Sequence, residues 1–92
     1  MPFYSFKPNP KQRVIDKAKN LFGRGSKVNV TGFRSASGAN HNGVVIPRGA
    51  YVVECFLNDK SIAIAHSKNW RKAYGLLVIE VEKVFEDLLH KA

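Results

Sequence analysis

Acidic residues, cysteines and long apolar runs are all scarce in this sequence. Of its 92 residues, only seven are Asp or Glu and one is Cys. A single cysteine excludes an internal disulfide, so the chain is not a disulfide-stapled scaffold. The longest apolar runs, such as Leu76–Ile79, are far below the roughly 20 residues that a membrane span needs. The first residues also lack the apolar stretch of about 7–15 residues that a secretory signal contains. We therefore expect an intracellular protein, nuclear or cytoplasmic.

Basic residues, in contrast, are abundant. Fifteen Lys and Arg give a net charge of +8, and 45% of the residues are apolar. This apolar content is enough to bury a core, and the length fits a single compact domain. We assign it to residues 10–92, preceded by an extended arm over residues 1–9. The charge predicts an anionic partner, namely nucleic acid, an acidic protein face or a membrane surface, and the absence of a spanning segment argues against a membrane.

Apolar spacing predicts a helix at each end of the domain. Asn9 and Pro10 suit a helix start, and Gly23 suits a helix end, which gives a helix over residues 10–22. From Trp70 to Leu89, apolar residues recur at spacings of three and four, which predicts a second helix over residues 68–90 capped by Ser67. Trp70 itself is expected in the core or half exposed at the helix start.

The region between the helices contains strand patterns. Alternating or β-branched residues predict strands over residues 27–33, 50–57 and 61–66, and the last two form a hairpin. Residues 35–43 are small and polar and predict a loop, and residues 44–49 predict a short edge strand ended by a turn. The expected fold is α+β with the order α-β-β-β-α. A three-stranded antiparallel sheet would carry both helices packed on one face.

Charge is distributed unevenly along the chain. Residues 1–79 carry 13 Lys and Arg but only three Asp and Glu, whereas residues 80–92 carry four acids. The second helix thus begins with Lys68, Arg71 and Lys72, although a helix dipole favours acids there by about 0.3–1 kcal/mol per charge. An anion bound at the helix start would compensate, so these three residues predict a phosphate site.

The segment Ser67-Lys68-Asn69-Trp70-Arg71-Lys72 resembles the start of the second helix in double-stranded RNA-binding domains. In that family the helix opens with a Ser-Lys-Lys-x-Ala-Lys pattern, which Lys68 and Lys72 match. Asn69 replaces the second lysine and Arg71 the alanine. The strand Tyr51–Phe56 before a short polar turn is similar to the family's second strand. Gly38 and His41 have the spacing of the family's Gly-Pro-x-His loop without its proline. The chain resembles a divergent member.

This resemblance implies recognition of double-stranded or structured RNA by its A-form shape, across two minor grooves and the phosphates between them. The residues it implies for the phosphates are Lys68, Arg71 and Lys72. Those implied for the grooves are Gln12, Arg13, Lys17 and Asn20 on the first helix, and Asn40, His41 and Asn42 in the loop.

Other functions are less well supported by the sequence. The three histidines and one cysteine have no metal-ligand spacing, and no catalytic arrangement is recognisable, so we expect neither an enzyme nor a metal or other cofactor. One alternative is a protein-interaction or dimerisation module on the same scaffold, and another is a small basic regulator of a nucleic-acid enzyme. If the first helix, residues 38–43 and residues 68–72 lie on one face, duplex RNA is favoured. An isolated patch at residues 68–72 favours the alternatives.

Overall fold

The computed structural model describes residues 9–36, 39–41 and 43–91. Along the described chain, five strands lie between two helices. The elements are α1 (Pro10–Phe22), β1 (Val28–Arg34), β2 (Ala39–His41), β3 (Val44–Ile46), β4 (Tyr51–Leu57), β5 (Lys60–Ser67) and α2 (Trp70–Lys91). The predicted arm lies outside the described residues apart from Asn9.

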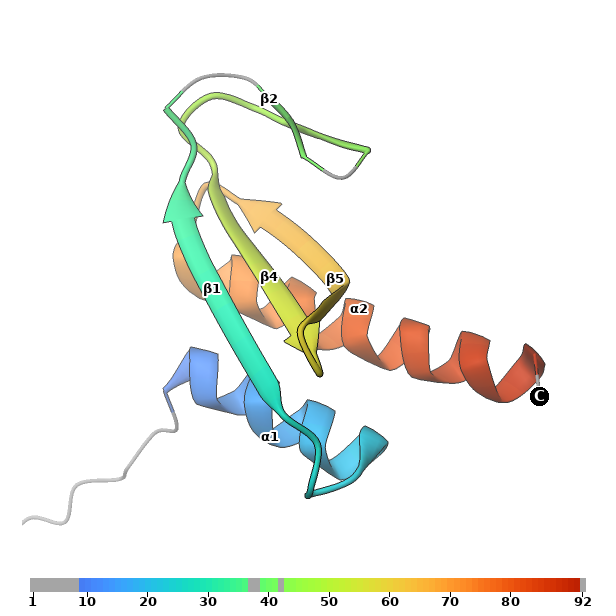
Figure 1. Cartoon of the computed structure of the whole chain (residues 1–92). Helices are drawn as coiled ribbons and strands as arrows, with labels where there is room; N and C mark the ends of the chain where they lie inside the picture. Colours follow the sequence, from blue (N-terminus) through green and yellow to red (C-terminus); the bar gives the residue numbers. More distant parts are fainter. Residues whose placement is uncertain (1–8, 37–38, 42, 92) are drawn as a thin grey trace, which may run out of the picture.

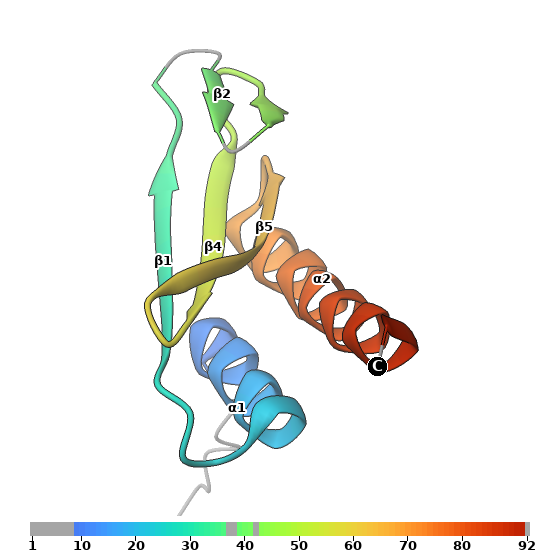
Figure 2. The same cartoon turned by 45° about the vertical axis from the view of Figure 1, so that its right-hand side comes forward.

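The main sheet contains three antiparallel strands in the order β1-β4-β5. Both helices cover the same face of this sheet and run alongside each other (Figures 1 and 2). The predicted α+β class, with an antiparallel sheet and two helices on one face, is therefore confirmed. The two strand pairings align Arg34 with Tyr51 and Tyr51 with Ser67, so these three residues mark one end of the sheet. α2 begins beside this end.

The core lies between the helices and the sheet. In β4, residues alternate between the two faces, and Val53 and Cys55 point to the helices and are fully buried. They pack with Leu77 and Val81 of α2 and with Val14 of α1, among others. The apolar stripes of both helices thus become buried against one face of the sheet, which supplies the main hydrophobic stabilisation.

Local sequence signals explain the bounds of α1. The Asn9 side chain accepts a hydrogen bond from the Lys11 backbone N–H at 2.9 Å, and Pro10 occupies the first turn, where its missing N–H has no helical partner to lose. Gly23 follows the last residue with a φ of 113°, which disfavours any residue with a Cβ. α1 therefore has the predicted bounds.

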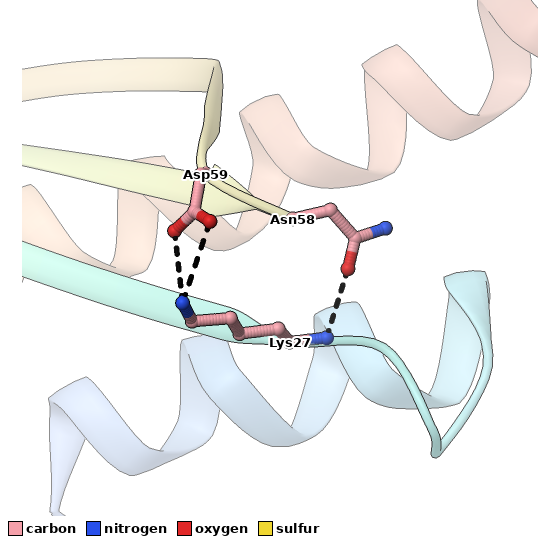
Figure 3. Close-up of polar contacts among 3 residues, drawn as sticks. All are labelled: Lys27, Asn58 and Asp59. Atoms are coloured by element: carbon pink, nitrogen blue, oxygen red, sulfur yellow. Dashed lines mark hydrogen bonds and ion pairs between the residues drawn. The ribbon is translucent and has the colours of Figure 1, made fainter.

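The opposite end of the sheet closes with a tight turn at Asn58 and Asp59. Both residues have positive φ angles, 50° and 68°, which suit a two-residue hairpin connection. The Asn58 side chain accepts a hydrogen bond from the Lys27 backbone N–H at 3.1 Å, and the Lys27 ammonium lies 3.1 Å from Asp59 Oδ1 (Figure 3). Lys27 is thereby paired at the end of the sheet away from the start of α2.

Residues 35–49 differ from the prediction. β2 and β3 pair with each other as a separate two-stranded sheet, so residues 44–46 are not an edge strand of the main sheet, and residues 39–41 are not a loop. Ile46 and Val44 pack with Val52 and Ile64 on the face of the main sheet that the helices leave uncovered. Hydrophobic burial against that face explains the extra hairpin, which the small polar residues before it did not indicate.

No helix among the described residues is both long enough and apolar enough to cross a membrane.

Candidate nucleic-acid interface

α2 begins at Trp70, and its cap is Asn69. The Asn69 side-chain oxygen accepts hydrogen bonds from the backbone N–H groups of Arg71 at 2.8 Å and Lys72 at 3.3 Å. The Ser67 hydroxyl accepts only from the Asn69 N–H, at 3.4 Å, outside the helix. The prediction that Ser67 caps this helix is therefore wrong. Because Asn69 already occupies two of the first free N–H groups, an anion at this helix start would depend on side chains.

The three predicted phosphate ligands surround this start. Lys68, Arg71 and Lys72 are all exposed, the first turn contains no acidic residue, and none of the three forms an ion pair with another described residue. The Arg71 guanidinium lies over the Trp70 ring, 4.9 Å from its centroid. Three unpaired cations at the positive end of a helix dipole create a positive potential that a phosphate group would neutralise.

Three of the four α1 residues predicted for a minor groove already contact other side chains of the protein. Gln12 donates to Asp16 at 2.9 Å, and Asn20 accepts from Arg24 at 3.3 Å. Lys17 is paired with Glu82 of α2 at 3.3 Å. These side chains are thus partly engaged within the protein, and Arg13 is the predicted residue of α1 for which no such contact is seen among the described residues.

A shallow groove of about 500 Å³ separates the two helices. Its lining residues are Arg13, Asp16, Lys17, Asn20, Gly75 and Val78. Three of the four predicted α1 residues therefore share one surface, and Gln12 does not line this groove.

The two helices also begin on the same side of the molecule. In Figure 1, α1 and α2 both start at the left and run to the right, so the first turns of the two helices lie on the same side of the molecule. Lys11 and Arg13 are exposed residues near the start of α1. The acids of α2, in contrast, follow Ile79. α2 thus has cations around its start and its acids farther along, whereas α1 carries Lys17 and Lys19 in its second half as well as Lys11 and Arg13 near its start.

The loop predicted to contact a second minor groove, residues 38–43, is only partly described. Asn40 and His41 lie in β2, where their backbones pair with Val45 and Val44, and Asn42 is outside the described residues. The β2–β3 hairpin extends from the end of the sheet at which α2 begins (Figure 1). Its Val44 and Ile46 pack with Val52 and Ile64, which belong to the sheet face opposite the helices. The structure thus groups the two helix starts and sets the hairpin toward the other face.

A row of aromatic and arginine side chains adjoins the start of α2, and the sequence did not indicate it. It consists of Arg34, Tyr51, Tyr74, Trp70 and Arg71, each in ring contact with the next. We call this row the ring strip. Burial, followed by a hydrogen bond with Tyr51, raises the pKa of Tyr74 to about 12, so its hydroxyl stays protonated. The residues come from β1, β4 and α2, so no local spacing connects them.

The remaining chemistry of the described residues is limited. No group of three or more His, Cys, Asp or Glu among them is placed to hold a metal ion. Burial raises the pKa of Cys55 to about 11, which keeps the thiol protonated within the core and suppresses its reactivity.

Comparison with protein-family models, with curated proteins and with solved structures gives no match for this chain.

Proposed function

We propose that this protein is a non-catalytic module that binds double-stranded or structured RNA through its phosphates and A-form shape. The observation that carries this proposal is the trio Lys68, Arg71 and Lys72 at the start of α2, which is exposed and forms no ion pair among the described residues, on the side of the molecule where α1 also begins. Cations without acidic partners cost folding free energy by mutual repulsion, and a polyanion would remove that cost.

The condition for duplex RNA, three basic elements on one face, is met by the two helix starts but not by the β2–β3 hairpin, which packs on the other face of the sheet. Two features of the arrangement still favour RNA over an acidic protein face. Apart from the β2–β3 hairpin, the order of a helix, three strands of one sheet and a helix is the order that the resemblance to double-stranded RNA-binding domains implies. Positive groups occur at two separate helix starts on one side of the molecule. A regular array of phosphates can engage both at once, which suits recognition by shape.

The test is a binding titration with an RNA duplex of about 20 base pairs, the matching DNA duplex and single-stranded RNA, each at several salt concentrations. We expect tighter binding to duplex RNA than to duplex DNA. The variant Lys68→Gln/Arg71→Gln/Lys72→Gln should bind the RNA duplex much more weakly than the wild-type protein does. The slope of log K against log salt should fall by about 1 for each phosphate that the protein no longer neutralises, and by about 3 if all three residues bind phosphate.

A matched control neutralises three cations elsewhere. Lys27 and Lys60 adjoin the Asn58–Asp59 turn, and Lys91 ends α2, so Lys27→Gln/Lys60→Gln/Lys91→Gln changes the net charge equally. We expect this control to retain most of the affinity and the salt slope. An equal loss of affinity in both variants, or an unchanged slope in the first, would contradict the assignment of the trio.

Equal, weak and steeply salt-dependent binding to all three nucleic acids would favour the protein-interaction alternative. The exposed apolar side chains of α2, in particular Leu76 and Ile79, would then be the first surface to mutate.

A further inference from the structure

The ring strip forms a continuous chain of contacts across three elements. The Arg34 guanidinium lies 5.7 Å from the Tyr51 ring centroid, and the Tyr51 and Tyr74 centroids are 6.1 Å apart. Trp70 meets Tyr74 edge to face at 6.2 Å, and Arg71 lies 4.9 Å from the Trp70 centroid. Each contact has the geometry of an attractive aromatic or cation–aromatic pair.

The inner part of the strip is fixed in position. Tyr74 is only 6% exposed, and its hydroxyl is hydrogen-bonded to Tyr51. Both hydroxyls lie so close to Gly32 of β1 that a Cβ there would be 2.6 Å from one and 2.8 Å from the other. Trp70 therefore packs, with its ring plane perpendicular to that of Tyr74, against a support that is held by three elements of the fold.

The outer part of the strip faces solvent. Trp70 is 41% exposed, although it is the largest aromatic side chain of the protein. The Arg71 guanidinium over the indole adds a second planar group, and Lys68 and Lys72 are exposed close by in the sequence. The surface thus combines a rigid stacking platform with positive charge that forms no ion pair among the described residues.

The charge around the indole restricts what it can bind. An exposed Trp ring can attract a cation, but Lys68, Arg71 and Lys72 would repel a cationic ligand. A base linked to phosphates satisfies both requirements, because it offers a flat face to the indole or guanidinium and negative charge to the cations. Within a regular duplex, however, every base is stacked inside the helix.

We infer that Trp70, together with Arg71, stacks on an unpaired base of the bound RNA, so the preferred ligand is a duplex interrupted or ended by unpaired nucleotides. This inference rests on the proposed RNA binding and specifies its substrate class. Lys68 and Lys72 neutralise the neighbouring phosphates. The pair formed by Trp70 and Arg71 then adds affinity only where a base is free of its duplex partner.

The test compares a blunt RNA duplex of about 20 base pairs with the same duplex carrying a two-nucleotide bulge, measured by anisotropy of labelled RNA. We expect about 5- to 150-fold tighter binding of the bulged RNA, which corresponds to the 1–3 kcal/mol typical of stacking one base on an aromatic side chain. Trp70 is the only tryptophan, so its fluorescence reports directly on this site. It should be quenched by the bulged RNA and remain nearly unchanged with the blunt duplex.

Two substitutions separate stacking from folding. Trp70→Leu should abolish the preference for the bulged RNA while retaining binding to the blunt duplex, and Trp70→Phe should keep part of the preference. Leu76→Ala is the matched control, because Leu76 is 44% exposed on the same helix and is not in the ring strip. Thermal unfolding should show that each variant remains folded.

The outcomes distinguish this inference from the proposed function. Equal binding of both RNAs by the wild-type protein, or a bulge preference that survives Trp70→Leu, would overturn the stacking site and leave RNA binding intact. Failure to bind either RNA would overturn both proposals.

Discussion

At the scale of single residues, two glycines have opposite relationships to their surroundings. Gly32 in β1 lies directly against the hydroxyls of Tyr51 and Tyr74, so the strand needs a residue without a Cβ there. Gly75 in the middle of α2 has no atom within 4 Å of an added Cβ. Packing explains the first glycine but not the second, and Gly75 lines the groove between the helices.

We therefore expect opposite effects from two alanine substitutions. Gly32→Ala should lower the free energy of unfolding by about 1–2 kcal/mol, because the two tyrosines have to move. Gly75→Ala should raise it by about 0.5–1 kcal/mol, because alanine is the better helix former and meets no obstacle. Urea unfolding of both variants measures these changes. A destabilised Gly75→Ala protein would mean that the groove between the helices is too narrow for a methyl group.

At the scale of an element, different residues cap the start of α2 and supply its positive charge. Asn69 satisfies the backbone of the first turn, while the flanking cations remain exposed and unpaired among the described residues. The helix start is thus stabilised locally by an uncharged side chain. The positive side chains are left available for a ligand.

Capping by Asn69 gives a clear expectation for stability. Asn69→Ala should lower the free energy of unfolding by about 1 kcal/mol, because two N–H groups of the first turn lose their acceptor. Ser67→Ala should change it by less than about 0.5 kcal/mol, because the long hydrogen bond of its hydroxyl lies outside the helix. Chemical denaturation of the two variants in parallel is the measurement. The reverse order of effects would show that Ser67 is the cap.

At the scale of the whole molecule, the two tyrosines connect the sheet to α2. Tyr74 of α2 contacts Tyr51 of β4 and lies close to Gly32 of β1. Loss of the proton from its hydroxyl would therefore place a charge within the interface between the helix and the sheet. Burial, then the hydrogen bond with Tyr51, raises the pKa of Tyr74 from 10.0 to about 12. The folded protein therefore holds this proton more tightly than the unfolded chain does.

This shift predicts a loss of stability in alkaline solution. The contribution of Tyr74 to the free energy of unfolding is fully present below pH 10, because the hydroxyl is then protonated in both the folded and the unfolded state. It is lost as the pH rises from 10 to about 12, where only the folded state keeps the proton. Burial also raises the pKa of Cys55, from 9.0 to about 11. Its thiol therefore adds a loss of stability that begins at a lower pH, near 9. Tyr74→Phe removes one titrating group, so its unfolding free energy should fall less steeply between pH 10 and 12. Identical slopes for wild type and variant would contradict the shift.

Much of the fold could be predicted from local patterns. The bounds of α1 follow from Asn9, Pro10 and Gly23, because capping and the special φ of glycine act within a few residues. The order of helices and main strands follows from apolar spacing of about 3.6 or 2 residues, which reflects one-sided burial. The cluster Lys68, Arg71 and Lys72 was also visible, since its members are neighbours in sequence. Its role as a phosphate site stays a prediction.

Other features required the assembled structure. The β2–β3 hairpin forms because Ile46 and Val44 find an uncovered sheet face formed by distant strands, and no local pattern encodes that face. Asn69 rather than Ser67 caps α2 because the helix begins two residues later than predicted, which hydrogen-bond geometry decides.

The sequence by itself thus determined the two helices, the three main strands, their order and the excess of positive charge, because these depend on short-range periodicity and on composition. Only the tertiary structure decided which charges remain unpaired. It joins Lys17 to Glu82 and Lys27 to Asp59, and it leaves the trio at the start of α2 exposed. It also assembled the ring strip, whose members come from β1, β4 and α2. Contacts between residues far apart in sequence depend on how the chain folds back on itself, and hydrophobic burial of the helices and sheet sets that arrangement.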